Sequence, residues 1–206
     1  MARKSGSNGK KTARELREAA TRLFAKYGYA AVSMRQIAAE VGVQAGALYL
    51  YTPDKQTLLY QIMDRHMDDL LGAWTAESAG NEDDPMTKIE QFVRFHIRFH
   101  LDRGDEIFIA YMELRNLSEE NFILIEQKRR QYEGLLGEIL KDGNDSGRFS
   151  LCDTKLSSYA IIAMLTGVST WYSGDGRLSL DKIEEIYLCM VRGLVSQGGP
   201  KTQSSR

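Results

Sequence analysis

The stretch from Ser33 to Lys55 constrains the fold more than any other part of the chain. Ser33, followed three residues later by Gln36, fits the capping box of a helix start. Gly42 then supplies a turn, and Pro53 stops a second short helix. Two short helices joined by a glycine turn are typical of the helix-turn-helix arrangement, whose second helix enters the major groove of DNA.

Charge favours this interpretation over a purely structural one. Two helices with a glycine turn also occur in helical proteins that never touch DNA. The net charge of −1 hides an asymmetry, because residues 1–55 hold ten Lys or Arg against four Asp or Glu. The remaining residues hold seventeen Lys or Arg against twenty-four Asp or Glu. A basic segment that coincides with the two-helix motif predicts contact with a polyanion.

Helical periodicity continues along the rest of the chain. Apolar residues recur at intervals of three and four, no alternating strand pattern occurs, and Pro and Gly fall at breaks. We therefore expect an all-α fold of about nine helices. An N-terminal three-helix DNA-binding domain is expected over residues 1–55, and a helical ligand-binding and dimerisation domain over residues 56–206. Residues 1–9 and 198–206 are expected to be disordered tails, because Gly, Ser, Lys and Arg dominate them.

The composition is that expected of a cytoplasmic protein without a catalytic site. No apolar run approaches the ~20 residues of a membrane span, and the first residues lack the apolar core of a secretory signal. Two distant cysteines, Cys152 and Cys189, favour a reduced environment. The chain contains no Gly-rich phosphate loop, nucleophile elbow or plausible catalytic triad. We therefore expect neither enzyme activity nor a cofactor.

A pair of histidines raises the alternative of a metal site. His96 and His100 are four residues apart, a spacing that can chelate a metal from one helix face. No Cys or carboxylate is placed to complete such a site, and Asp102 lies on another face. We therefore interpret the pair as core or pocket histidines and expect no metal.

The segment from Ala13 to Leu59 resembles the N-terminal domain of the TetR family of bacterial transcriptional regulators, with unbroken spacing. One departure is Thr52, where the family usually has phenylalanine. The matching positions are Ala20, Leu23, Phe24, Gly28, Tyr29, Ser33, Met34, Ile37, Ala38, Val41, Gly42, Val43, Gly46, Leu48, Tyr49, Tyr51, Lys55, Leu58 and Leu59.

The resemblance implies which residues contact DNA. Small side chains at the start of the third helix would let base edges approach, and Gln44 would hydrogen-bond adenine in the major groove. The other polar residues would hold phosphates and set the register. The ring of Tyr49 could instead pack mainly on the first helix, and both roles stay open. The expected DNA-binding residues are Ser33, Arg35, Gln44, Ala45, Gly46, Ala47, Tyr49, Tyr51 and Lys55.

The resemblance also implies a homodimer on a palindromic double-stranded operator, because family members bind DNA in pairs. Two apolar stripes fit such an interface, one from Leu156 to Trp171 and the other from Ile183 to Leu194. The small residues Ala160, Ala163 and Gly167 would allow another helix to approach closely. The same stripes could pack into the core of one chain, and we expect both uses.

The middle helices are expected to enclose a small hydrophobic effector. The helix expected over residues 85–103 is apolar or aromatic around most of its circumference, which indicates that neighbouring helices surround it. An aromatic stripe is more often plain core than a ligand site, so the resemblance supports the region more than each residue. The expected lining is Phe92, Phe95, His96, Phe99, Phe108, Tyr111, Met112, Met164 and Trp171.

The stretch from Trp171 to Ser179 is similar to a loop in TetR-family regulators of fatty-acid and sterol-fragment degradation, which often respond to acyl-CoA thioesters. An acyl-CoA is therefore one candidate effector, with its nucleotide end near Arg94, Arg98 or Arg103. The plainer interpretation of the loop is a turn between two helices. We expect a ligand-responsive transcriptional regulator, favoured as a repressor that its effector releases from DNA. The alternatives are a drug- or aromatic-compound-responsive repressor of an efflux gene, a transcriptional activator and a helical adaptor.

Overall fold

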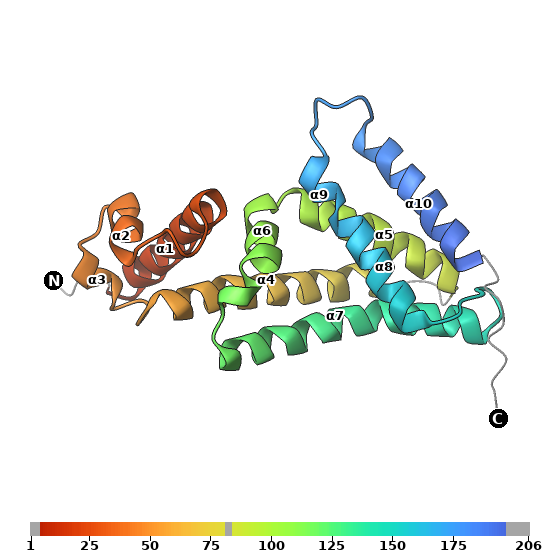
Figure 1. Ribbon diagram of the computed structural model, residues 1–206, viewed down its shortest axis with the longest axis horizontal. Coiled ribbons are helices and arrows are strands. Elements are labelled where there is room, and N and C mark those ends of the chain that lie inside the picture. The colour runs from red at the N-terminus through yellow and green to blue at the C-terminus, as the bar shows by residue number, and fades with distance from the viewer. Residues whose placement is uncertain (1–4, 81–83, 197–206) are drawn as a thin grey trace. The chain divides into compact units, whose positions relative to one another are not determined.

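The computed structural model describes residues 5–80 and 84–196, and every regular element within these ranges is a helix, which confirms the all-α expectation (Figure 1). No helix in these ranges combines the length and apolar character that crossing a membrane requires. The elements are α1 (Ser5–Tyr27), α2 (Met34–Val41), α3 (Ala45–Leu48), α4 (Lys55–Glu77), α5 (Pro85–Leu101), α6 (Gly104–Met112), the 3-10 helix η1 (Leu114–Asn116), α7 (Glu119–Asp145), α8 (Thr154–Thr166), α9 (Val168–Trp171) and α10 (Leu180–Ser196).

Several helix ends differ from those that the sequence pattern predicts, which ends the third helix at about Leu50 and stops the seventh at Gly143. The first helix begins at Ser5, so residues 5–9 are helical although a disordered tail was expected there. The other expected tail residues, 1–4 and 198–206, lie outside the described ranges. The third helix ends at Leu48 rather than at Leu50, and a turn follows it. The seventh continues through Gly143 to Asp145, because a glycine alone does not stop a helix.

The contacts between residues divide the chain into two compact units. The first unit comprises the chain up to Asp69 together with Asp105–Lys128, and the second comprises Leu70–Gly104 together with the chain from Arg129 onward. The first unit thus contains α6, η1 and the start of α7 in addition to the expected DNA-binding helices. The boundary expected at residue 55 separates domains by function, whereas these units are defined by contacts. The expected boundary therefore stays a prediction.

The core of the first unit takes one apolar face from each of its helices. Leu16, Ala20 and Phe24 recur every four residues along α1, and each is at most 1% exposed. Full burial of a side chain as large as that of Leu16 or Phe24 contributes ~1.5–3 kcal/mol relative to leaving it exposed. The other buried members are Tyr29, Val32, Ile37, Ala38, Leu48, Leu58, Leu59, Ile62, Met63, Ile109 and Ile125.

The second unit surrounds α5. The pair Asp84-Pro85 predicts an N-cap followed by a proline in the first turn, and the structure confirms both. Asp84 caps the helix by accepting a hydrogen bond from the Thr87 backbone N–H at 3.1 Å. The enclosed character expected for α5 is confirmed, because buried residues follow one another around most of its circumference. They are Ile89, Phe92, Val93, His96, Ile97, Phe99 and His100.

Candidate DNA-binding and effector sites

Local hydrogen bonds fix both ends of helix α2. The Ser33 backbone N–H donates to Gln36 Oε1 at 2.8 Å, and the Gln36 backbone N–H donates to Ser33 Oγ at 3.3 Å, which confirms the predicted capping box. At the other end, Gly42 adopts φ 74° and its N–H reaches the Ala38 carbonyl. This left-handed conformation favours glycine, and it turns the chain directly into α3.

The start of α3 presents little side-chain bulk. Gln44 is the exposed N-cap of this helix, and its side chain makes no capping hydrogen bond. A Cβ atom added at Gly46 would meet no other atom within 4 Å, so open space lies in front of the helix. Leu48 is fully buried and anchors the opposite side. The arrangement leaves an amide free to read a base edge, with Ala45 and Ala47 beside it.

The two tyrosines that follow α3 have different surroundings. Tyr49 is 55% exposed, so its ring is not buried against the first helix, whereas Tyr51 is partly buried against the core of the first unit. Arg35 is exposed on α2. Thr52, the departure from the family pattern, is buried, and its hydroxyl donates to the Asp54 carbonyl at 3.1 Å. This hydrogen bond satisfies the polar group that replaces the usual aromatic ring.

Lys55 has an internal role that the sequence did not predict. Its Nζ donates to the carbonyls of Tyr29 and Val32, each at 2.9 Å, and lies 4.2 Å from the centroid of the Tyr29 ring. An ammonium carries three protons, and these carbonyls use two of them. Lys55 therefore fixes the turn before α2, and its expected contact with a phosphate stays a prediction.

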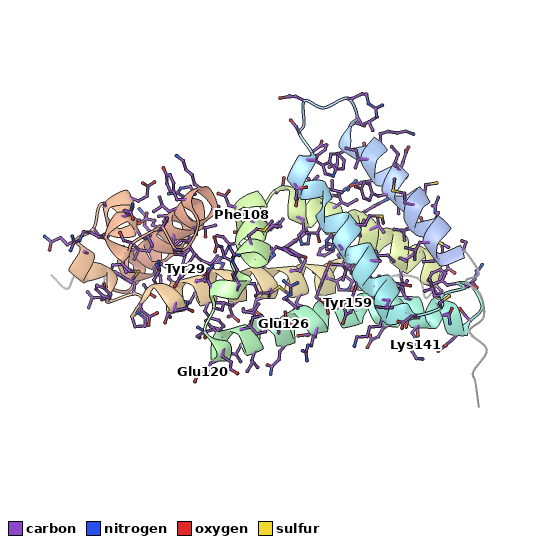
Figure 2. The ribbon with its side chains drawn as sticks, viewed as in Figure 1. Tyr29, Phe108, Glu120, Glu126, Lys141 and Tyr159 are labelled. Carbon is purple, nitrogen blue, oxygen red and sulfur yellow. The ribbon has the colours of Figure 1, made fainter. Side chains whose placement is uncertain are left out.

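The aromatic residues expected to line the effector site divide between the two units. Phe92, Phe95, His96 and Phe99 come together on α5 in the second unit, where the Phe92 ring centroid lies 5.1 Å from that of Trp74. In the same unit Met164 is partly buried on α8, and Trp171 on α9 is 55% exposed. The other three belong to α6 of the first unit: Phe108 (labelled in Figure 2), Tyr111 and Met112. They are 40, 40 and 57% exposed, respectively.

His96 is held by hydroxyl groups from two other helices. Its Nδ1 lies 2.9 Å from Tyr132 Oη and its Nε2 lies 2.9 Å from Thr166 Oγ1. The His100 ring stacks on it at 4.0 Å, and His100 Nδ1 lies 2.8 Å from the His96 carbonyl. Between Ser5 and Ser196, residues 81–83 apart, no three His, Cys, Asp or Glu side chains gather as metal ligands would. This arrangement suits a hydrogen-bonded core pair.

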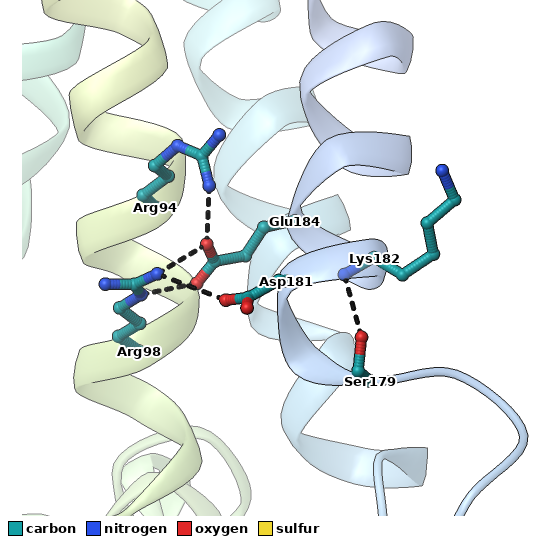
Figure 3. A network of polar contacts seen from close by, with 6 residues as sticks. All are labelled: Arg94, Arg98, Ser179, Asp181, Lys182 and Glu184. Atoms are coloured by element: carbon teal, nitrogen blue, oxygen red, sulfur yellow. Dashed lines mark hydrogen bonds and ion pairs between the residues drawn. The ribbon is translucent and has the colours of Figure 1, made fainter.

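The arginines expected near a nucleotide are engaged within the second unit. Arg94 Nη1 donates to Glu184 Oε2 at 2.7 Å, and Arg98 Nε donates to Glu184 Oε1 at 2.5 Å (Figure 3). Hydrogen bonding to Glu184 raises the pKa of Arg98, and Asp181 lies 3.6 Å from its guanidinium. The Arg103 guanidinium stacks 4.0 Å from the Phe99 ring centroid.

Glu184 is not among the residues predicted from the sequence, although a signal was present. It lies on α10 four residues after Leu180 and four before Leu188, so it shares a helix face with two leucines. An acidic residue on a buried stripe needs a partner that compensates for its lost hydration. The structure supplies two arginines, and beside them a surface cleft of about 730 Å³ is lined by Arg98, Leu101, Asp102, Ser169, Tyr172, Gly174, Leu180 and Asp181.

The C-terminal helices bury one side and expose another apolar side. On α8, Ile161 and Leu165 are buried, whereas Leu156 is 63% exposed and Tyr159 is 40% exposed. The small residues Ala160 and Ala163 are also exposed. On α10, Met190 is 51% exposed. The exposed face defined by Leu156, Tyr159, Ala160, Ala163, Trp171 and Met190 is called the α8–α10 apolar face below.

Two family models match the chain. Residues 82–195 match the model described as "Tetracyclin repressor-like, C-terminal domain", which covers more than half of the chain. Residues 16–62 match the model described as "Bacterial regulatory proteins, tetR family". The two matches are consecutive and do not overlap.

Individual proteins show similarity along the same length. The HTH-type transcriptional repressor KstR2 of Rhodococcus jostii (strain RHA1) is 26% identical over 189 residues, which are 91% of each protein. The crystal structure of a tetR-family regulatory protein from Rhodococcus RHA1 is 29% identical, has a TM-score of 0.83, and matches over 90% of this chain and 97% of that one. AibR, solved in complex with isovaleryl coenzyme A and operator DNA, is 24% identical over 87% of this chain and 97% of its own; its TM-score of 0.80 shows likeness of fold. The chain described here belongs to the TetR family of bacterial regulatory proteins.

Proposed function

We propose that this protein is a cytoplasmic transcriptional repressor that binds a palindromic operator as a homodimer and leaves it when a hydrophobic small molecule binds. The observation that carries this proposal is the start of α3. There Gln44 and open space at Gly46 face outward, while Leu48 anchors the helix in the core. A short helix that is rigidly held and nearly bare in front suits entry into the major groove.

Each expected DNA-binding residue has a role in this proposal. Gln44 reads a base edge, and Ala45, Gly46 and Ala47 leave room for bases. Arg35 and the capped start of α2 at Ser33 face the phosphates, because a helix N-terminus attracts anions. Tyr49, Tyr51 and the third proton of Lys55 add contacts that set the register.

The α8–α10 apolar face supports dimerisation. Large side chains such as Leu156 and Met190 are more than half exposed there, although contiguous exposed apolar surface is costly in water. Ala160 and Ala163 are exposed on the same helix as Leu156, and their small side chains allow close helix packing. A second copy would cover this face through the two-fold symmetry that a palindromic operator requires.

Two observations support an acyl-CoA as the effector class. The similar regulator AibR was solved with isovaleryl coenzyme A. The loop from Trp171 to Ser179 has the resemblance described above. In this proposal Arg94 and Arg98 do not hold the nucleotide end, because their guanidinium groups already compensate for Glu184. Recognition of the nucleotide end is therefore assigned to other groups.

The test uses the purified full chain. Duplexes are selected from a random library, and the binding of the enriched sequence is measured by fluorescence anisotropy with and without isovaleryl-CoA and longer acyl-CoA thioesters. We expect enrichment of a palindrome, a stoichiometry of two chains per site, and release of DNA by at least one thioester. Gln44→Ala should relax the choice of base at one position in each half-site. Failure to enrich any sequence would count against the proposal, and enrichment without release would remove acyl-CoA as the effector.

A further inference from the structure

A ring of polar contacts joins the turn after α1 to the segment between α6 and α7, and all of its members lie in the first unit. The Tyr29 backbone N–H donates to Glu113 Oε1 at 3.0 Å. Glu113 also accepts a hydrogen bond from the Asn116 side-chain amide. Only 6% of Glu113 is exposed, so these donors compensate for the water that its carboxylate has lost.

Tyr29 is held on its other side as well. Lys55 Nζ donates to the Tyr29 carbonyl at 2.9 Å and lies over its ring. The ring packs edge-on against Phe24, with centroids 5.2 Å apart. One residue therefore donates to a carboxylate and accepts from an ammonium, and the two charged groups come from different segments. Charge-assisted hydrogen bonds are the strong ones, so this pair fixes the turn tightly.

Gln56 adds a second connection between the same segments. Its Nε2 donates to the Asn116 carbonyl, and its Oε1 accepts from the Ser118 backbone N–H at 3.0 Å. Burial raises the pKa of the Tyr29 hydroxyl, and a hydrogen bond with Gln56 acts in the opposite direction. The start of α4, the turn after α1 and the α6–α7 connection are thus tied into one network.

Tyr29 lies just before α2, so the network holds the chain where this helix begins. Tyr29 lies four positions before Ser33, the N-cap of α2. Val32, within that turn, is buried, and its carbonyl also accepts from Lys55. Gly28, at φ 81°, brings the chain close to Glu113: a Cβ there would lie 3.6 Å from Glu113 Oε1. The turn has little freedom, so the position of Tyr29 determines where α2 and α3 begin.

We propose that Glu113 is a positioning residue for DNA binding: it fixes the Tyr29 peptide and thereby the orientation of α2 and α3 relative to the start of α4. This inference rests on the proposed function, because it assigns Glu113 a role in presenting α3 to an operator. Glu113 itself touches no DNA in this role. It acts through the hydrogen bond to Tyr29, so a side chain that can accept that bond should replace it.

The test compares two substitutions of similar length. In Glu113→Gln the amide oxygen can still accept from Tyr29, and Asn116 can turn its own amide to match. In Glu113→Met no acceptor remains. The matched controls are Glu120→Gln and Glu120→Met, at an exposed position on α7 (Figure 2). Two quantities are measured on the full chain: hydrogen exchange of the Tyr29 amide by NMR, and affinity for the duplex that the unaltered protein selects from a random library.

We expect Glu113→Met to speed exchange of the Tyr29 amide and to weaken duplex binding about tenfold, the effect of losing one hydrogen bond to a charged group. Glu113→Gln should retain most of the affinity and the protection, and both Glu120 variants should match the unaltered protein. Unchanged affinity in a folded Glu113→Met variant would overturn the inference, and so would an equal loss in Gln and Met. If the unaltered protein selects no duplex, the proposed function fails, whereas the exchange rates still decide whether Glu113 fixes the turn.

Discussion

Arg98 on α5 and Glu184 on α10 form a two-point ion pair, in which Arg98 Nε lies 2.5 Å from Oε1 and Nη2 lies 2.9 Å from Oε2. The carboxylate is fully buried, whereas the Arg98 side chain is 56% exposed. The pair is therefore asymmetric. Arg98 can return to water if its partner is removed, but Glu184 cannot, because the packing of α10 holds it in place.

This asymmetry predicts that the loss of Arg98 is costly as long as Glu184 keeps its charge. Arg98→Met should lower the free energy of unfolding by roughly 1.5–3 kcal/mol, because a buried carboxylate loses two charge-assisted hydrogen bonds. Combining it with Glu184→Gln should cost less than the sum of the single changes, since the buried charge is then gone. Urea denaturation of the three variants measures both quantities.

The control for the ion pair lies on the same helix. Lys182 and Glu185 pair at 2.8 Å, but each is 57% exposed. Lys182→Met should leave the free energy of unfolding nearly unchanged, because water competes for both charges. An effect of Lys182→Met equal to that of Arg98→Met would show that burial of Glu184 is not what matters.

Ala163 is exposed on α8, and a substitution at this position tests where the expected dimer interface lies. Ala163→Arg should convert the expected dimer to monomer without unfolding the chain, because a long charged side chain prevents close helix packing. Sedimentation equilibrium measures the mass, and circular dichroism checks the fold. Gln131→Arg adds the same side chain at an exposed position on α7 and should leave the mass unchanged. A dimer that tolerates Ala163→Arg would place the interface elsewhere.

Much of the fold could be predicted from local sequence. Three local features are present as the sequence predicts: the buried apolar stripe of Leu16 and Phe24, the cap at Ser33 and the helix start at Asp84-Pro85. Each depends only on residues that are close together in the chain. The helix through Gly167 was expected to continue to Trp171. Instead α8 ends at Thr166, and the short α9 follows.

The polar networks could not be predicted, because their partners are distant in the chain. Glu184 meets arginines 86 and 90 positions away, and Glu113 meets Tyr29 across 84 positions. A single acidic residue indicates at most that a partner is needed. Which cation or N–H supplies it depends on how helices pack, and periodicity does not contain that information. For the same reason, Lys55 could be placed at a helix start but not above the Tyr29 ring.

Lys55 provides a test of how many phosphates the protein contacts. Lys55→Met should weaken duplex binding, and the slope of log affinity against log salt should become less negative by about 0.9, the value for one lost phosphate contact. Lys128→Met is the matched control, because the Lys128 ammonium is held at 2.6 Å by both Asp64 and Asp68. Its slope should not change. If Lys55→Met lowers the affinity for the duplex but leaves the salt slope unaltered, Lys55 contacts no phosphate and acts only through the turn before α2.

Two glycines on α7 predict stability effects of opposite sign. A Cβ at Gly143 would lie 2.0 Å from Phe149 Cδ2, and that ring is only 4% exposed, so it cannot swing away into water. Gly143→Ala should therefore destabilise the fold by ~1–3 kcal/mol through overpacking. At Gly134 a Cβ would meet nothing within 4 Å, so Gly134→Ala should stabilise by ~0.5–1 kcal/mol through helix propensity. Urea midpoints at equal slope distinguish the two effects. If both substitutions stabilise the protein, Phe149 does not occupy the space against Gly143 in solution.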